Sequence, residues 1–85
     1  MAKIEIYTSP FCGYCHRAKS LLKKKKAAFE EVDVFTTRGA RDEMMARSKG
    51  HHTVPQIFID GKFIGGCDEL FELDHHGGLD PLLAV

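Results

Sequence analysis

Cys12-Gly13-Tyr14-Cys15 marks the point at which the sequence pattern changes from that of a strand to that of a helix. Before this stretch, apolar and polar residues alternate from about Lys3 to Thr8, which predicts a strand. After it, apolar residues recur at helical spacing, which predicts a helix from about Gly13 to Lys26. The first thiol therefore falls at or just before the N-terminus of a helix.

The position of Cys12 predicts a reactive thiol. The thiolate is the nucleophile, and the unpaired N–H groups and dipole of a helix N-terminus stabilise that anion. A cysteine pKa of about 8.5 can fall to roughly 3.5–7.5 in such a setting. Because Cys15 follows on the first helical turn, the two sulfurs can close a short disulfide and reopen it. Cys12 and Cys15 are therefore the candidate catalytic residues.

Two other uses of a C-x-x-C pair stay open on the residues alone. A zinc site needs a second pair of ligands at similar spacing, and the one further cysteine, Cys67, has no Cys or His partner at that spacing. A secreted protein with structural disulfides would contain more cysteines and usually a signal peptide. A C-x-x-C pair within a β–α pattern favours redox chemistry over both.

Length and composition bound the classes of protein. The 85 residues predict one domain, spanning 1–85, and a hydrophobic content of 44% is ordinary for a globular protein. Formal net charge is zero, so we expect no nucleic-acid partner. The sequence contains no apolar stretch near eighteen residues and no signal-peptide pattern. We therefore expect no membrane partner and a location in the reducing cytoplasm.

Two further patterns are interpreted as surface features. The basic run Lys23–Lys26 is typical of the solvated C-terminal end of a helix, where cations suit the dipole. Adjacent histidines point in different directions on a helix or strand, and neither His51-His52 nor His75-His76 pairs with cysteine at ligand spacing. We expect loop histidines and no metal site.

The remaining elements predict a mixed sheet. Residues 29–34 have the pattern of a second strand, and residues 38–48 that of a helix ending near Gly50. Two short strands, 56–59 and 62–65, flank Asp60-Gly61, the dipeptide preferred in a type I′ turn. The order β-α-β-α-β-β-α is completed by a third helix, and it gives an α/β fold, a four-stranded mixed sheet flanked by helices.

The third helix is expected to begin near Asp68 and to stop at Gly77-Gly78. After it, Asp80-Pro81 has the pattern of an N-cap followed by proline at the first helical position. This pair predicts a last short helical turn through Leu82 and Leu83.

Three motifs in this order give the chain its likeness to a known family. They are Cys12-Gly13-Tyr14-Cys15 after the first strand, Thr53-Val54-Pro55 before the third, and Gly65-Gly66-Cys67-Asp68 after the fourth. Over nearly its whole length the chain resembles the glutaredoxins, small dithiol proteins of the thioredoxin-like fold. The resemblance implies a glutathione-dependent thiol–disulfide oxidoreductase that reduces protein disulfides and glutathione mixed disulfides.

The resemblance also implies roles for individual residues. Cys12 would attack and carry glutathione, and the more buried Cys15 would act as the resolving thiol. Pro55 would follow a cis peptide bond, a point that the residues alone leave open. Glutathione, the co-substrate, would contact seven residues, which are Tyr14, Thr53, Val54, Pro55, Gly66, Cys67 and Asp68.

Within this expected site, Asp68 would take the γ-glutamyl ammonium and also act as the helix N-cap, with the helix N–H groups taking the neighbouring carboxylate. Cys67 would contact glutathione through its backbone and not through its sulfur.

The chain departs from the family pattern at two positions. Gly13 stands where proline is commonest, and Ser9 stands where many glutaredoxins have a lysine for the glycyl carboxylate. Arg41 is the best replacement for that cation by position, with Arg38 in reserve. Either arginine is equally well interpreted as a solvated helix residue.

Two alternative functions follow from the same residues. A dimer could hold a [2Fe–2S] cluster through Cys12 of each copy and two glutathiones, an arrangement that Gly13 permits and that Cys15 opposes by closing a disulfide. A thioredoxin-like general reductant is disfavoured by the Gly65-Gly66 pair and Asp68. The leading hypothesis is a monomeric oxidoreductase whose partners are glutathione and disulfide-bonded or glutathionylated proteins.

Overall fold

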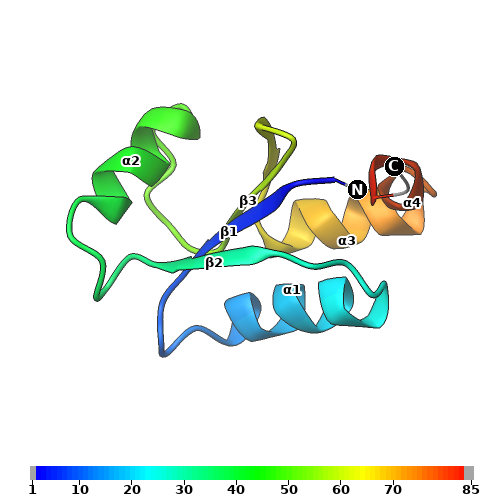
Figure 1. The fold of residues 1–85 in the computed structure, drawn as a ribbon, viewed down its shortest axis with the longest axis horizontal. Helices are drawn as coiled ribbons and strands as arrows, with labels where there is room; N and C mark the ends of the chain where they lie inside the picture. Colours follow the sequence, from blue (N-terminus) through cyan, green and yellow to red (C-terminus); the bar gives the residue numbers. More distant parts are fainter. Residues whose placement is uncertain (1, 84–85) are drawn as a thin grey trace.

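The fold is built on one four-stranded sheet, as a computed structural model describing residues 2–83 shows (Figure 1). The strand order is β2-β1-β3-β4. β1 (Ile4–Thr8) pairs in parallel with β2 (Glu30–Asp33) and antiparallel with β3 (Gln56–Ile59), which pairs antiparallel with β4 (Lys62–Gly65). The predicted mixed sheet is confirmed.

Helices cover both faces of the sheet. α1 (Gly13–Lys24), α3 (Cys67–His75) and α4 (Leu79–Leu83) pack on one face, over a core that includes Ile6 and Ile57. α2 (Ala40–Arg47) packs on the other face, against Tyr7 and Phe58. The central strands are therefore buried on both sides, which explains the nearly continuous apolar run of β3.

The β3–β4 hairpin follows the chemistry of its turn. Asp60 and Gly61 have φ values of 52° and 79°. Two consecutive positive φ angles are what a type I′ turn requires, and Asp-Gly meets this requirement at little steric cost. The predicted bounds of both strands are confirmed.

The starts of two helices differ from the prediction. The N-cap of α3 is Gly66, and the Glu69 carboxylate accepts a hydrogen bond from the Gly66 N–H at 2.6 Å. The expectation that Asp68 is the N-cap is therefore wrong, because Asp68 lies inside the first turn. α4 begins at Leu79, a fully buried residue, so Asp80 does not cap it either.

The basic run at the end of α1 is only partly solvated. Lys23 and Lys24 are exposed, as expected for a helix end. Lys25 is half-buried, and its ammonium lies 2.8 Å from a carboxylate oxygen of Asp74 and 2.9 Å from one of Asp80. Lys25 therefore links the C-terminal end of α1 to both α3 and α4.

Among the helices that the structure describes between residues 2 and 83, none combines the length and the apolar character that a membrane crossing requires.

Candidate active site

Cys12 occupies the N-cap position of α1. Its backbone is extended, and its sulfur accepts a hydrogen bond from the Cys15 N–H at 3.0 Å. The first turn of α1 contains no acidic residue that would oppose a thiolate. The predicted position at the start of the helix is confirmed, and it favours the anionic form of this thiol in the reduced protein.

The two cysteines form a disulfide, with their Cα atoms 5.2 Å apart. Their surroundings differ, because Cys15 is 1% exposed whereas Cys12 is half-buried. The neighbours Phe11 and Tyr14 are exposed. An incoming thiol or disulfide can therefore reach the Cys12 sulfur, while the Cys15 sulfur faces the protein interior.

The loop before β3 lies beside this disulfide. The Cys12 sulfur is 3.7 Å from the carbonyl oxygen of Val54. The Val54–Pro55 peptide bond is cis, as the resemblance to the glutaredoxins implied. This arrangement brings the second sequence motif against the first.

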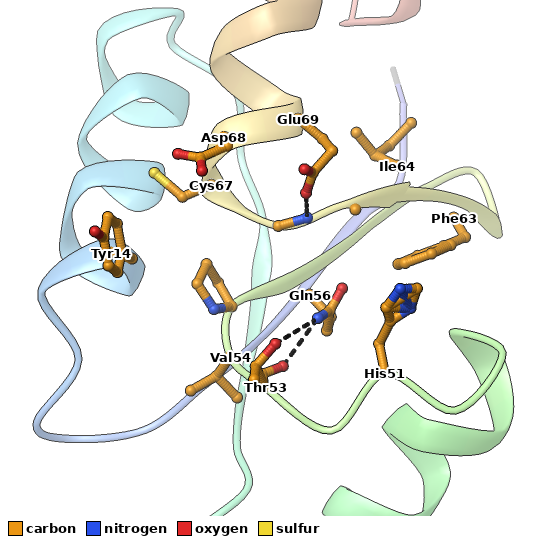
Figure 2. Close-up of a pocket in the computed structure, with 13 residues that line it drawn as sticks. Tyr14, His51, Thr53, Val54, Gln56, Phe63, Ile64, Cys67, Asp68 and Glu69 are labelled. Atoms are coloured by element: carbon orange, nitrogen blue, oxygen red, sulfur yellow. Dashed lines mark hydrogen bonds between the residues drawn. The ribbon is translucent and has the colours of Figure 1, made fainter.

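A pocket of about 720 Å³ extends from this loop to the start of α3. Its volume is within the range of small-molecule sites. Figure 2 shows Tyr14 at one end, His51 and Phe63 at the other, and Asp68 across from Thr53. The lining includes all seven of the residues expected to contact glutathione: Tyr14, Thr53, Val54, Pro55, Gly66, Cys67 and Asp68.

Two glycines let the chain turn at the upper wall of the pocket. Gly65 has a φ of +123°, and a Cβ there would lie 2.7 Å from Cγ of Glu69. A Cβ at Gly66 would lie 3.1 Å from the carbonyl oxygen of Pro55. The glycine pair therefore allows both the turn and the close approach of the third motif to the second.

Arg41 lies outside the residues that line this pocket. It is exposed on α2, and its Nη1 donates to the carbonyl oxygen of His52 at 2.6 Å. Together with Arg38 it lines a separate depression around the start of α2. Arg41 therefore contacts the loop that leads to Thr53, and its distance along the chain gave no sign of this contact.

Five lining residues lie outside the three sequence motifs: His51, Gln56, Phe63, Ile64 and Glu69. Gly65 belongs to the third motif but was not among the residues expected to contact glutathione. The Glu69 position carries a sequence signal, since a Glu three residues after an N-cap is typical of a capping box. Gln56 carries none, although its Nε2 donates to the Thr53 carbonyl oxygen at 2.9 Å.

The oxygen of the same Gln56 amide, Oε1, is buried and has no hydrogen-bond partner among the described residues. Rotating the amide by half a turn would bring this oxygen against the Thr53 carbonyl, so the orientation is fixed. The Nε2 donor of Gln56 therefore ties the start of β3 to Thr53.

Cys67, the third cysteine, has a thiol pKa above its ordinary value. Burial raises the pKa of the Cys67 thiol, and the Arg17 guanidinium offsets only part of that rise. Cys67 is 4% exposed. Its thiol is therefore less readily ionised at neutral pH than an exposed cysteine thiol.

Comparisons with known proteins agree with this geometry. The model of the family described as "Glutaredoxin" matches residues 4–64. Glutaredoxin 3 of Escherichia coli (strain K12) is 57% identical over 83 residues, which cover 98% of this chain and 99% of that protein. The chain belongs to the glutaredoxin family.

Solved glutaredoxin structures share the fold. A solution structure of glutaredoxin from Brucella melitensis has a TM-score of 0.84 at 49% identity, covering 98% of this chain and 89% of that one. A crystal structure of a buckwheat glutaredoxin–glutathione complex has a TM-score of 0.87 at 31% identity, covering 94% and 74%. The thioredoxin-like fold expected from the sequence is confirmed.

The activity follows from the family and from the cysteine pair together. Glutaredoxins are glutathione-dependent thiol–disulfide oxidoreductases. The glutaredoxin described here has its Cys12–Cys15 pair at the N-terminus of α1, with one accessible and one buried sulfur. The protein is accordingly an enzyme of this class.

Proposed function

We propose that Cys12 is the nucleophile and Cys15 the resolving thiol of this glutaredoxin. The observation that carries the proposal is the difference in exposure between the two sulfurs, combined with the N-cap position of Cys12. An approaching substrate meets Cys12 first, and the N–H of Cys15 stabilises the thiolate that leaves or attacks there.

The first proposed substrates are mixed disulfides between glutathione and proteins. The Cys12 thiolate attacks the glutathione sulfur, and the protein leaves as a thiolate that takes up a proton. Glutathione is then disulfide-bonded to Cys12. A second glutathione thiolate attacks the sulfur of the bound glutathione, which releases glutathione disulfide and regenerates Cys12. Cys15 takes no part in this route.

The second proposed substrates are protein disulfides. The Cys12 thiolate attacks one substrate sulfur, and the other substrate sulfur leaves as a thiolate. Cys15 loses its proton and attacks the Cys12 sulfur of the mixed disulfide, which releases the reduced protein. The product on the enzyme is the Cys12–Cys15 disulfide, the form in which the structure shows this pair. Two glutathiones then reduce it and leave as glutathione disulfide.

The proposed glutathione site is the pocket between the loop 53–55 and the start of α3. Backbone N–H groups at the N-terminus of α3 suit the γ-glutamyl carboxylate, and the exposed Asp68 carboxylate suits the ammonium on the same carbon. Val54 offers its backbone beside Cys12, where the cysteinyl part of the tripeptide must lie for its sulfur to react. Tyr14 and Thr53 line the same pocket.

Arg41 is the proposed partner of the glycyl carboxylate. Arg41 is exposed, and among the described residues its guanidinium donates one hydrogen bond, from Nη1 to the His52 carbonyl oxygen, so four N–H donors stay available for a carboxylate. The contact with His52 holds the arginine next to the loop that contains Thr53. This support is indirect, since Arg41 does not line the pocket.

The iron–sulfur alternative has less support. A cluster ligated by Cys12 would have to form in the reduced protein, and Cys15 competes with it by closing the disulfide with Cys12. A Cβ at Gly13 would meet nothing within 4 Å. This open space permits the approach of a cluster but does not select for one. We therefore propose the oxidoreductase alone, in the cytoplasm, where glutathione keeps thiols reduced.

Two cysteine variants test the proposal. Reduction of a glutathionylated small disulfide, coupled to glutathione reductase, should be abolished by Cys12→Ser and retained by Cys15→Ser. Reduction of a protein disulfide should be lost in both. If Cys15→Ser kept full activity on the protein disulfide, the resolving role of Cys15 would be wrong.

A further inference from the structure

Arg17 lies at the seam between α1 and α3, one helical turn beyond Tyr14. Its guanidinium carbon is 5.9 Å from the ring centroid of Tyr14 and 5.4 Å from that of Phe71. Tyr14 belongs to α1 and Phe71 to α3. One guanidinium is therefore shared by two aromatic rings from the two helices that meet at the active site.

These two helices carry different parts of the site. α1 carries Cys12 at its N-cap and Tyr14 in the pocket wall. α3 presents Cys67 and Asp68 at its N-terminus, on the same pocket. The distance from the nucleophile to the proposed γ-glutamyl site therefore depends on how the first turns of α1 and α3 are held together.

Tyr14 needs a partner to keep a defined position. Its side chain is 58% exposed, and Figure 2 shows it at one end of the pocket, apart from the other lining side chains. An exposed ring without packing partners would sample several rotamers. The Arg17 guanidinium is such a partner, because it attracts the ring by a cation–π interaction.

We propose that Arg17 is a positioning residue for glutathione: its guanidinium links Tyr14 of α1 to Phe71 of α3 and so keeps Tyr14 in place relative to the N-terminus of α3. The proposal rests on the glutathione site described above. Arg17 does not line the pocket, so it acts through Tyr14 and not by touching the reacting atoms.

The positive charge of Arg17 should also favour glutathione binding. The guanidinium is close enough to the start of α3 to oppose the rise in the pKa of the Cys67 thiol. It therefore adds positive potential where the γ-glutamyl carboxylate is proposed to lie, in a pocket whose described lining carries two carboxylates, Asp68 and Glu69, and neither Lys nor Arg.

Two variants separate the planar stacking of Arg17 from its charge. Arg17→Met removes both and keeps an unbranched side chain, whereas Arg17→Lys keeps the charge and loses the planar group that fits between two rings. Lys24→Met is the matched control, because Lys24 is an exposed cation on the same helix, far from the pocket. All three changes preserve helix-forming residues.

Binding of S-methylglutathione gives the first measurement, because its capped sulfur cannot react. We expect Arg17→Met to raise Kd about three- to tenfold, Arg17→Lys to raise it less, and Lys24→Met to leave it unchanged. The KM for glutathione should rise in parallel, with kcat at saturation and the reduction potential of the Cys12–Cys15 pair unchanged. An unchanged Kd in Arg17→Met would overturn the proposal.

Tyrosine fluorescence gives a second measurement that does not need a ligand. The chain has two tyrosines and no tryptophan, and Tyr7 is only 1% exposed. Quenching by acrylamide, which is uncharged and so does not respond to the loss of the arginine charge, therefore reports on Tyr14. Arg17→Met should increase this quenching relative to the Lys24→Met control, and equal quenching in the two variants would contradict the proposed contact.

The two measurements also distinguish this proposal from the proposed function. If the wild-type protein failed to bind S-methylglutathione, the glutathione site would be wrong, and the role of Arg17 in glutathione binding would fall with it. If the wild-type protein binds and Arg17→Met binds equally well, only the positioning role fails.

Discussion

The guanidinium carbon of Arg47 lies 4.1 Å from the ring centroid of Phe58, on the face of the sheet that α2 covers. The same guanidinium donates to both carboxylate oxygens of Glu5, at 2.9 and 3.1 Å, and to the Tyr7 hydroxyl at 2.9 Å. One residue at the end of α2 therefore joins that helix to β1 and β3.

Replacing Arg47 should destabilise the fold without changing the chemistry. Arg47→Met loses the forked ion pair and leaves Glu5 partly buried without its partner, at a cost of about 2 kcal/mol. Arg47→Lys should recover less than half of this, since an ammonium cannot bond both oxygens in the same geometry. Urea unfolding measures the loss, and a stability equal to the wild type in Arg47→Met would contradict it.

Acid should destabilise the fold by protonating two carboxylates of the sheet, Glu5 and Glu31. Hydrogen bonding to Arg47 lowers the pKa of Glu5 from its ordinary value of 4.5, and hydrogen bonding to Lys19 and Thr8 lowers that of Glu31. Both carboxylates are charged in the folded and unfolded chains well above pH 4.5. As the pH falls, the unfolded chain takes up protons first, so stability is lost until the pH has passed the folded pKa values.

The corresponding experiment is urea unfolding between pH 7 and pH 3. Glu5→Gln should be less stable at pH 7 and should lose less stability on acidification than the wild type. Glu31 is more exposed, at 39% for its side chain, so solvent screening makes the effect of Glu31→Gln smaller. Equal acid sensitivity of Glu5→Gln and the wild type would sink this assignment.

The three cysteines should react in a fixed order. In the reduced protein at mildly acidic pH, iodoacetamide should label Cys12 first, because its sulfur is accessible and sits at the N-terminus of α1. Cys67 should react much more slowly than Cys12, because burial raises the pKa of its thiol. Mass spectrometry of the digested protein reads out the order, and early labelling of Cys67 would refute it.

Asp68 should matter for glutathione and not for the fold. Asp68→Ala should raise the KM for glutathione severalfold, and Asp68→Asn should have a milder effect because the amide oxygen still accepts a hydrogen bond. Kd for S-methylglutathione must be measured alongside, since KM in a two-substrate reaction is not a dissociation constant. Unchanged values in both variants would remove Asp68 from the site.

Gly65 and Gly13 should respond in opposite ways to alanine. Gly65→Ala forces a Cβ to 2.7 Å from Glu69 Cγ at a φ of +123°, which should cost about 1–3 kcal/mol and raise the KM for glutathione. Gly13→Ala meets nothing within 4 Å on a helical turn and should stabilise the protein by about 0.5–1 kcal/mol. Thermal unfolding of both variants tests the contrast.

Most of the fold could be predicted because its signals are local. Alternation in β1, the apolar run of β3 and the Asp60-Gly61 turn each act over a few residues, and the observed strands match them. The helix starts were less predictable. Glu69 and Gly66 cap α3 together although glycine has no side chain to signal this, and burial of Leu79 sets the start of α4 ahead of the Asp80-Pro81 pattern.

The site was predictable where its residues come in motifs and not elsewhere. The three motifs supplied eight of the pocket residues, seven of which were expected to contact glutathione. His51 and Phe63 come together through tertiary packing, with ring centroids 5.4 Å apart, and neither belongs to one of the three motifs. The contact of Arg41 with the His52 carbonyl likewise depends on how α2 lies against the following loop, which residue spacing does not report.

The contacts of Lys25 with Asp74 and Asp80 have a consequence for motion. Together with the packing of α1 on the core, these ion pairs hold the end of α1 that lies opposite to Cys12. Rearrangement during the redox cycle should therefore be confined to the segment around residues 11–15. Amide hydrogen exchange should speed up there on reduction, while the amides of the last turn of α1 and of α3 keep the same protection in both redox states.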